Sequence, residues 1–310
     1  MRKAPLEMNP LLSWLLRVAL FTLGLGVSLL PRWLELWLGP TLGRLALALD
    51  PRRRRIAYDN MRRCLPELGP RRWDSLLRSN YEHYGLLALE ILHMFSPIPG
   101  HYRRYAQQVA RLEGLENWRR AHDKGKGVLF VSAHLANWEL MVAAGALSGI
   151  PITMVTRRLK PEWLLKKIEA SRASVGVRCA YQPRTMPAVL KGLRRGESIG
   201  FVLDQYAPPP MGISVPFFGV AVDTLAALGP LAERTGAAIV PALQSRSPDG
   251  TVRIVIEPEL DLGERRGDPY ESTAALALKV EDWIRRRPQE WLWVHRRFKN
   301  VAWPTLGSRA

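Results

Sequence analysis

One short segment of the sequence carries the residue types of acid–base chemistry. The run SAHLANWE, residues 132–139, places His134 directly after an apolar stretch and Glu139 five positions later. On one continuous helix, side chains five positions apart point about 140° away from each other. The two can meet if His134 lies in a loop and Glu139 in the first turn of the following helix, for which Asn137 is a good cap. We therefore expect a loop-to-helix turn that brings His134 and Glu139 together.

A His–Glu pair of this kind would act as a general base. A carboxylate bonded to one imidazole nitrogen fixes the tautomer and stabilises the imidazolium, which leaves the other nitrogen free to take a proton. The attacking group would then be a hydroxyl of the substrate. Two other interpretations are a structural histidine at a strand end and a metal ligand. Metal binding has little support, because H-E-x-x-H is absent and the six histidines are scattered, so we expect no metal and no cofactor.

The candidate base lies in a region where strand and helix patterns alternate. Buried-strand patterns cover residues 127–132, 151–155, 198–203, 237–243 and 252–256, and helical patterns cover residues 137–147, 161–174 and 272–287. Such alternation predicts an α/β domain with a largely parallel central sheet. In these sheets the working residues gather beyond the carboxyl ends of the strands. His134, Arg157 and Asp204 all come at or just after an expected strand end.

The amino-terminal segment has the length and composition of a membrane anchor. Residues 10–30 are apolar apart from Arg17, close to the roughly 20 residues that cross a bilayer. No small-residue cleavage site follows, as a signal peptide would require, and Trp33 and Trp37 suit a membrane interface. The basic block 52–55 then predicts that the rest of the chain faces the cytoplasm. A helix lying in the interface and a buried core helix are the alternatives.

These patterns divide the chain into three expected regions. Residues 1–50 would be a membrane anchor and interfacial helix, residues 51–110 an amphipathic helical lead-in, and residues 111–310 the α/β domain. The helical lead-in rests on the leucine pattern of residues 56–95, which Pro66 and the Gly69–Pro70 pair interrupt.

The charge balance favours anionic partners. Forty-five Lys and Arg against 28 Asp and Glu give a net charge of +17 over 310 residues. Acidic lipid headgroups, an acidic carrier protein and nucleic acid would all be attracted, although a generally Arg-rich surface is the simpler explanation. Nucleic acid is not expected, since no base-reading motif or stacking platform is present. The two cysteines lack metal or redox spacing, which fits a reducing compartment.

Several separate blocks carry a family resemblance across nearly the whole chain. They are SAHLANWEL from Ser132, NMRRCLP from Asn60, TRRLKP from Thr156, GFVLDQ from Gly200, VPFFG from Val215 and RRRPQEWLWVHRRFK from Arg285. Together and in this order they resemble the lipid A biosynthesis acyltransferases, the late lauroyl and myristoyl transferases of Gram-negative bacteria. The resemblance implies a glycerolipid-acyltransferase-like central sheet flanked by helices, with an amino-terminal membrane-anchoring segment.

The resemblance also implies a reaction and its partners. An acyl chain would move from acyl carrier protein to a hydroxyl of a growing lipid A, an anionic lipid acceptor. The enzyme would sit at the bacterial inner membrane with its catalytic domain on the cytoplasmic face. No oligomeric state and no acyl chain length are predicted.

Residue roles follow from the same resemblance. His134 would deprotonate the acceptor hydroxyl, and Glu139 would orient and support it. Arg157 is the best side-chain candidate for stabilising the oxyanion, and Asp204 has a positioning role at the site. The substrate-contacting residues implied by the blocks are Asn137, Trp138, Arg158, Gln205, Phe217 and Phe218.

Each role has a structural alternative. Arg157 would be an ordinary surface cation, Asp204 a turn cap before Pro208, and the two phenylalanines ordinary core. The WLWVHRRFK segment reads alternatively as a terminal strand with solvated basic ends, and His295 within it is expected to be structural.

The chain also departs from the family pattern. YAPPPM, residues 206–211, is unusually rich in proline, and residues 225–236 match only loosely. These departures leave open an acyltransferase of the same fold that acts on a lysophospholipid or another glycolipid. The third possibility is a non-catalytic protein that uses its positive charge to bind membrane or nucleic acid.

Overall fold

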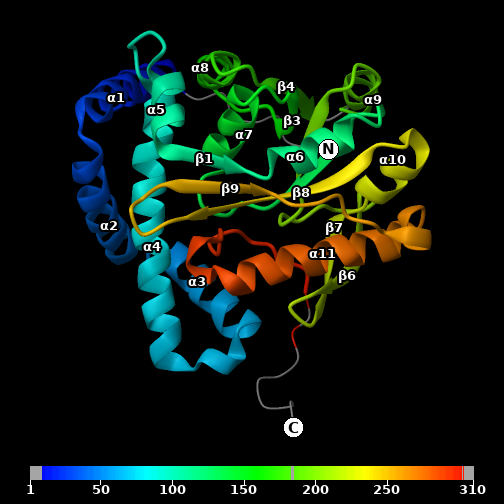
Figure 1. Ribbon diagram of the computed structural model, residues 1–310. Coiled ribbons are helices and arrows are strands. Elements are labelled where there is room, and N and C mark those ends of the chain that lie inside the picture. The colour runs from blue at the N-terminus through cyan, green and yellow to red at the C-terminus, as the bar shows by residue number, and fades with distance from the viewer. Residues whose placement is uncertain (1–8, 183–184, 302, 304–310) are drawn as a thin grey trace.

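A central mixed sheet organises the molecule (Figure 1). The computed structural model describes residues 9–182, 185–301 and 303. Its seven-stranded sheet has the order β1-β9-β8-β2-β5-β3-β4. The strands are β1 (Ala110–Glu113), β2 (Val128–Ser132), β3 (Ile152–Arg157), β4 (Arg178–Gln182), β5 (Ser198–Val202), β8 (Ala238–Arg246) and β9 (Val252–Ile256). Strands β8, β2, β5, β3 and β4 run parallel, and β9 pairs antiparallel with β8. The expected α/β fold with a mostly parallel sheet is therefore confirmed.

Helices cover both faces of the sheet because its central strands are apolar on both sides. All five residues of β2 are buried, as expected of a strand between two helical layers. Phe130 and Ile152 pack with Leu140 on one side, whereas Leu129 and Ile199 pack with Trp283 on the other. We name these the α7 face and the α11 face after the helices that cover them, which lie above and below the sheet in Figure 1.

The helices are the following. Before the sheet come α1 (Pro10–Leu29), α2 (Arg32–Leu49), α3 (Pro51–Cys64), α4 (Pro70–Leu92) and α5 (His101–Val109). Within it are α6 (Leu115–His122), α7 (Trp138–Leu147), α8 (Glu162–Ala173), α9 (Met186–Arg194), α10 (Leu228–Thr235) and α11 (Pro269–Arg286). Short 3₁₀ turns are η1 (Pro66–Leu68), η2 (His93–Phe95), η3 (Gly263–Arg266) and η4 (Pro288–Glu290).

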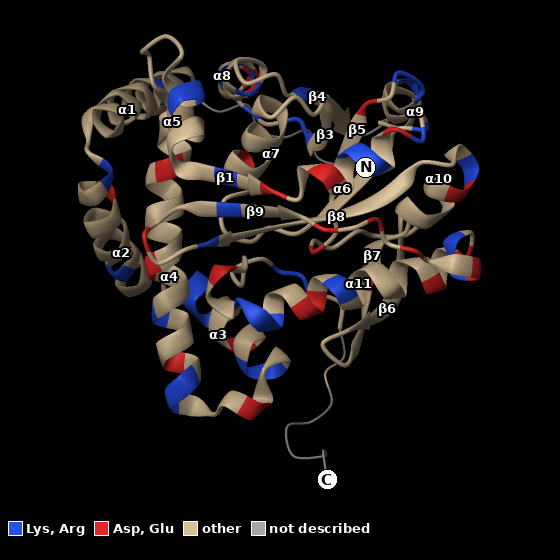
Figure 2. Ribbon diagram, in the orientation of Figure 1, with Lys and Arg blue, Asp and Glu red and all other residues tan. Residues whose placement is uncertain are grey.

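Helix α1 is long and apolar enough to cross a membrane. Its 20 residues have a mean hydropathy of 1.7, and large apolar side chains such as Leu12, Trp14 and Leu29 are exposed along it. Figure 2 shows almost no charge on α1, whereas Lys and Arg are spread over many of the other helices. The exposed apolar surface continues onto α2 with Trp33 and Trp37.

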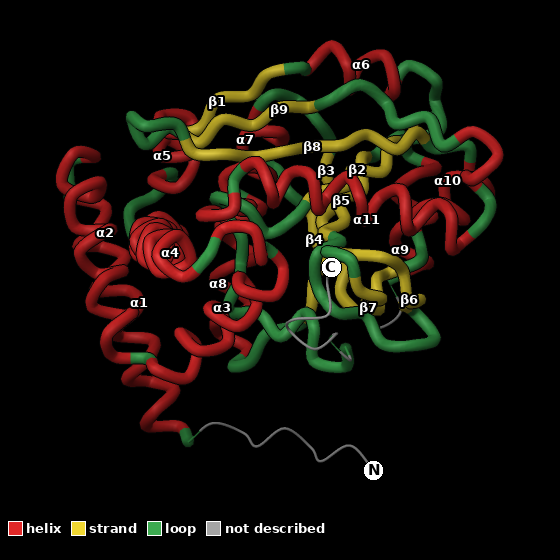
Figure 3. The backbone as a smooth tube through the Cα atoms, turned by 90° about the horizontal axis from the view of Figure 1, so that it is seen from below, coloured by secondary structure: helices red, strands yellow, loops and turns green. Residues whose placement is uncertain are grey.

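Helix α2 packs very closely on α4, which Figure 3 shows end-on beside it. A Cβ added at Gly39 would lie 2.6 Å from the Cα of Leu86, and one at Gly85 would lie 2.0 Å from the Gly39 carbonyl oxygen. Only glycine allows two helix backbones to approach this closely. The contact fixes the amino-terminal helices to the rest of the molecule.

A two-stranded hairpin, β6 (Gly212–Phe217) and β7 (Val220–Leu225), packs beside α11. Its turn is formed by Phe218, with φ 51°, and Gly219, with φ 75°. The hairpin contains the VPFFG block, whose strand structure the sequence did not predict.

The carboxy-terminal block is not a strand. Residues 291–299 form turns rather than a ladder, with Trp293 fully buried and Arg297 at 1% exposure. The Asn60 side chain donates to the Trp293 carbonyl at 2.8 Å, and Asn80 donates to the Trp291 carbonyl at 2.9 Å. The alternative of a terminal strand with solvated basic ends is thus wrong, because α3 and α4 bind this segment through its backbone.

Candidate active site

The His134 loop joins β2 to α7 and is held on both sides. Asn137 caps α7, since its side-chain oxygen accepts from the backbone N–H groups of Glu139 at 3.1 Å and Leu140 at 3.0 Å. Gln244, buried on β8, donates to the carbonyls of Ala133 at 2.7 Å and Leu135 at 2.9 Å. The expected loop-to-helix turn is confirmed, and it presents His134 at the carboxyl edge of the sheet.

The carboxylate that meets the imidazole belongs to Asp204. The Nδ1 of His134 lies 2.8 Å from Oδ1 of Asp204. The other oxygen, Oδ2, accepts from the His134 backbone N–H at 2.9 Å and from the Trp291 indole at 2.7 Å. Asp204 is 2% exposed, so this carboxylate has a fixed orientation.

Sheet register explains why these two residues meet. Strands β2 and β5 are parallel neighbours in which Ser132 pairs with Val202. Two residues beyond that pair, the chains reach His134 and Asp204 at equivalent positions. Parallel pairing therefore places the imidazole and the carboxylate beside each other at the sheet edge.

The environment keeps Asp204 ionised. Burial by itself would raise its pKa, but attraction to His134 and hydrogen bonds from His134 and Trp291 outweigh burial and lower the pKa to about 2. The charged carboxylate accepts a hydrogen bond from the Nδ1–H group, which favours the tautomer whose Nε2 is unprotonated. That nitrogen lies 3.2 Å from the amide nitrogen of Gln205, which can donate to it.

Glu139 has a different partner from the one expected. It forms a two-pronged ion pair with Arg172 of α8. The Nε of Arg172 donates to Oε2 of Glu139 at 3.0 Å, and the Nη2 of Arg172 donates to Oε1 of Glu139 at 2.6 Å. The expected contact between Glu139 and His134 is therefore replaced by two separate pairs. The physical reason is that the helix turns Glu139 into the layer between α7 and α8, while the loop turns His134 toward β5.

The Glu139–Arg172 pair is buried and mutually dependent. Burial alone would lower the pKa of Arg172, but the hydrogen bonds and attraction of Glu139 raise it above its ordinary value. Removing one partner of such a pair leaves an uncompensated charge inside the protein.

We expect Glu139→Gln to lower the free energy of unfolding by about 3–5 kcal/mol. The matched control is Glu113→Gln, because Glu113 also forms a two-pronged pair, with Arg253, but on the surface at side-chain exposures of 46% and 52%. The control should unfold almost like the wild type. Chemical denaturation of the detergent-solubilised proteins measures the free energy of unfolding of both variants. Equal losses would contradict the claim that removing one partner costs more in a buried pair than in an exposed pair.

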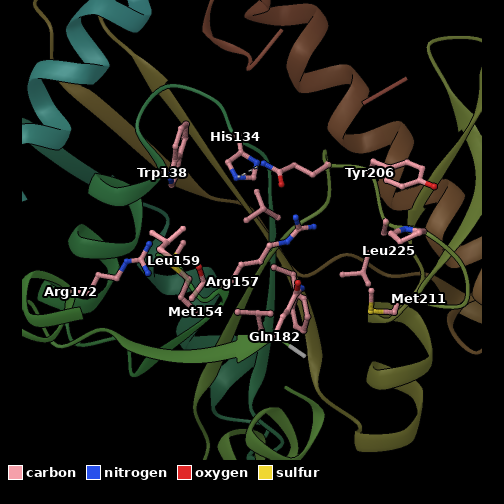
Figure 4. Close-up of a pocket in the computed structure, with 17 residues that line it drawn as sticks. His134, Trp138, Met154, Arg157, Leu159, Arg172, Gln182, Tyr206, Met211 and Leu225 are labelled. Carbon is pink, nitrogen blue, oxygen red and sulfur yellow. Dashed lines mark hydrogen bonds between the residues drawn. The ribbon is translucent and has the colours of Figure 1, made fainter. Parts of the chain in front are cut away.

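A cavity of about 250 Å³ opens beside the imidazole (Figure 4). Its lining combines His134, Arg157, Arg172 and Gln205 with apolar side chains such as Met154. The side chain of Arg157 extends from its strand toward His134 (Figure 4). Trp138 packs edge-on against the imidazole, with ring centroids 4.9 Å apart. The cavity therefore has two guanidinium groups and the His134 imidazole around one space.

Four of the expected substrate contacts lie elsewhere. Asn137 is 1% exposed and is used up as the α7 cap. Arg158 stacks over Tyr181 at 5.3 Å. Phe217 and Phe218 are buried in the core around Trp291. These two rings thus follow the alternative interpretation, in which they are ordinary core residues. Trp138 and Gln205, by contrast, line the cavity.

A second buried carboxylate supports the loop from behind. Glu90 of α4 accepts from Arg32 at 2.7 Å, from Arg246 at 2.6 Å and from the Asn137 amide at 2.9 Å. Burial would raise its pKa, but Arg246, Arg32 and Asn137 lower it to about 2. The network ties α2 and β8 to the cap of α7. Local sequence patterns did not predict Glu90, Arg172 or Trp291 as members of the site, although Trp291 lies in one of the blocks that carry the family resemblance.

Within the described ranges, no group of three or more His, Cys, Asp and Glu side chains is placed to hold a metal ion. The chain thus combines an α/β fold, an imidazole–carboxylate pair beside a cavity, and an apolar helix long enough to cross a membrane.

The comparisons with known proteins place the chain in a family. The family model described as bacterial lipid A biosynthesis acyltransferase matches residues 7–300. The protein therefore belongs to the bacterial lipid A biosynthesis acyltransferases and is an acyltransferase. It is 28% identical over 271 residues to the lipid A biosynthesis lauroyltransferase of Escherichia coli (strain K12), which covers 84% of each chain.

Two further relatives differ from the lauroyltransferase by name, one in the acyl chain and the other in the acceptor. The lipid A biosynthesis palmitoleoyltransferase of the same strain is 28% identical over 290 residues, 89% of this chain and 90% of the relative. The phosphatidylinositol mannoside acyltransferase of Mycolicibacterium smegmatis is 28% identical over 210 residues, 61% of this chain and 67% of the relative.

Proposed function

We infer that the protein transfers a fatty acyl chain from acyl carrier protein to a hydroxyl of a lipid A precursor in lipopolysaccharide biosynthesis. The observation that carries this inference is the buried Asp204 at Nδ1 of His134, which leaves Nε2 available beside a cavity lined by Arg157. The enzyme works at the bacterial inner membrane, with its catalytic domain on the cytoplasmic face.

The general base is His134 supported by Asp204. The acceptor hydroxyl takes the position at Nε2 that the Gln205 amide occupies at 3.2 Å. As Nε2 removes the hydroxyl proton, the oxygen attacks the thioester carbonyl carbon, and Asp204 stabilises the imidazolium that forms. The tetrahedral intermediate collapses with cleavage of the carbon–sulfur bond. The imidazolium then returns its proton to the leaving thiolate, which completes the transfer.

The intermediate carries a negative oxygen that needs fixed positive charge or hydrogen-bond donors. Arg157 extends into the cavity from the end of β3 and is the candidate for this role. Glu139 acts indirectly in this scheme, because it holds the Arg172 guanidinium in the cavity wall.

The position of the cavity suits an acceptor that arrives from a membrane. The Trp163 indole at the start of α8 donates to the Ser13 hydroxyl of α1 at 2.8 Å. The apolar helix α1 therefore contacts α8, the helix that follows the cavity-lining residue Leu159. Leu159 and Met211 line the cavity and are 41% and 55% exposed. Exposed apolar side chains at the cavity that Arg157 also lines match a lipid with an anionic headgroup and apolar chains.

A glycolipid other than a lipid A precursor is the second candidate acceptor. The similarity to the mycobacterial phosphatidylinositol mannoside acyltransferase favours it, and the base and cavity would serve either acceptor. The two candidates differ in the acceptor alone, so acceptor choice is the property to test.

Mass spectrometry of reaction products tests this function. The full-length enzyme is incubated with acyl carrier protein charged with mixed acyl chains and with a tetra-acylated lipid A precursor, a lysophospholipid or a phosphatidylinositol mannoside. We expect one added acyl mass on the lipid A precursor only. Transfer to one of the other two lipids alone would contradict the acceptor, and equal rates from acyl-coenzyme A would contradict the preference for the carrier protein.

A further inference from the structure

A second cavity lies under α7, away from the catalytic groups. Its volume is about 40 Å³, and every side chain that lines it is apolar, with Phe130, Met141, Ala242 and Ile254 among them. Cavities with purely apolar walls stay dry and bind apolar groups. The acid–base mechanism makes no use of this space.

The second cavity is next to the active-site cavity on the same face of the sheet. Gly200 of β5 pairs in register with Met154 of β3 on one side and with Phe130 of β2 on the other. Met154 lines the active-site cavity, whereas Gly200 and Phe130 line the apolar one. Met154 and Phe130 both belong to the core of the α7 face. One cross-strand row thus forms the boundary between the two spaces.

Gly200 leaves an opening in that row. A Cβ placed on Gly200 would meet no heavy atom within 4 Å. Gly200 lies in β5 and its φ angle is not positive. Neither the backbone conformation nor steric crowding therefore requires glycine at this position. Glycine inside a strand weakens it and often marks a place where a ligand approaches closely. The missing side chain therefore leaves space for something that is not part of this chain.

We propose that the acyl chain of the donor passes from the active-site cavity over Gly200 and ends in the apolar cavity under α7, so that Gly200 and the far wall set its length. The proposal rests on the proposed function, which supplies the acyl donor. Met154 and Met141 stand on the two sides of the passage, and unbranched thioether side chains repack easily around a methylene chain. The carbonyl carbon then lies near His134 while the methyl end lies under α7.

Substitutions at Gly200 test the passage directly. Gly200→Ala and Gly200→Val add one and three carbons to the open space, and the products are weighed after competition among acyl carrier proteins that bear chains of ten to sixteen carbons. We expect the preferred chain to become shorter, with the ratio of wild-type-length to shorter product falling about tenfold or more for Gly200→Val, since one methylene in an apolar pocket discriminates by that factor. Gly200→Ala should give the smaller shift.

A milder pair of variants keeps the test valid if Gly200→Val fails to fold. Ile254→Val removes one carbon from the cavity wall and should shift products toward longer chains. Ile239→Val is the matched control, because Ile239 is equally buried on a strand but packs on the α11 face, and it should leave the profile unchanged. An unchanged chain-length profile in both Gly200→Ala and Ile254→Val, with active enzyme, would overturn the proposal.

Cross-linking locates the chain without any substitution. Acyl carrier protein bearing a dodecanoyl chain with a terminal diazirine is irradiated on the wild-type enzyme, and labelled peptides are sequenced. Labels on residues that line the apolar cavity, on α7, β5, β8 or β9, are expected. Labels confined to α1 would place the chain in the membrane and overturn the proposal. A wild-type enzyme that transfers no acyl chain would instead refute the proposed function, and the inference with it.

Discussion

His134→Ala is expected to lower kcat for acyl transfer by about 10²- to 10⁴-fold, the contribution of a positioned general base. The alanine cannot accept the hydroxyl proton. Among the described residues that line the cavity no other base takes its place, since Arg157 and Arg172 are cationic and Gln205 is an amide. The fold should persist, because the imidazole is at the cavity surface with 16% side-chain exposure. Single-turnover rates with acyl carrier protein thioester, together with thermal unfolding, measure both effects.

The matched control is His295→Ala. His295 is part-buried, and burial lowers its pKa. It also lies close enough to Asp204 and His134 for their charges to shift that pKa. It is outside the cavity lining, so its loss should change kcat by only a few fold. A His295→Ala enzyme as impaired as His134→Ala would move the base to His295.

The fold was predictable where strands are mostly buried. Strands β2, β3, β5 and β8 appear in the sequence as apolar runs, because helices cover both of their faces. Strand β9 was predicted from the alternating Val252, Ile254 and Ile256, which face one layer of the core. Strand β4 was missed because it lies at the edge of the sheet and is only partly buried, so its sequence, RCAYQ, lacks that pattern. Strand β1, at the other edge of the sheet, was also not predicted, because it has only four residues.

The residues of the site were easier to predict than their partners. His134 and Asp204 both stand out at strand ends, but local spacing favoured Glu139 as the partner of the imidazole. The correct partner depends on strand order, and nothing in the sequence says that β5 lies next to β2. Once that pairing is known, the register of Ser132 with Val202 places Asp204 beside His134.

Buried charged residues were the least predictable part of the site. Arg172 and Arg297 resemble the many surface cations in the sequence, yet both are buried. Arg297 donates to the carbonyls of Gln205 and Asp223 at 2.6 Å each, and burial lowers its pKa to about 10. It thus holds the backbone of the residue that touches Nε2 of His134. Such contacts join segments some 70–90 positions apart, and local patterns carry no information about them.

Asp204→Asn is expected to lower kcat by about 10²- to 10⁴-fold with little change in KM, although the substitution is nearly isosteric. An Asn side chain can donate its amide N–H to Nδ1, which would move the imidazole proton to Nε2 and block proton abstraction there. It also removes the charge that stabilises the imidazolium. Because the change acts on the transition state and not on binding, the loss should fall on kcat.

Two controls separate this role from a general loss of structure. Asp223→Asn alters a carboxylate on the neighbouring hairpin whose backbone carbonyl, not its side chain, receives Arg297, and it should behave like the wild type. Glu139→Gln should lower stability more than Asp204→Asn does, but it should lower kcat less once both enzymes are assayed below their unfolding temperatures. The opposite order of kcat, with Glu139→Gln the more impaired enzyme, would return the support of the base to Glu139 and leave Asp204 as a structural anchor of the loop.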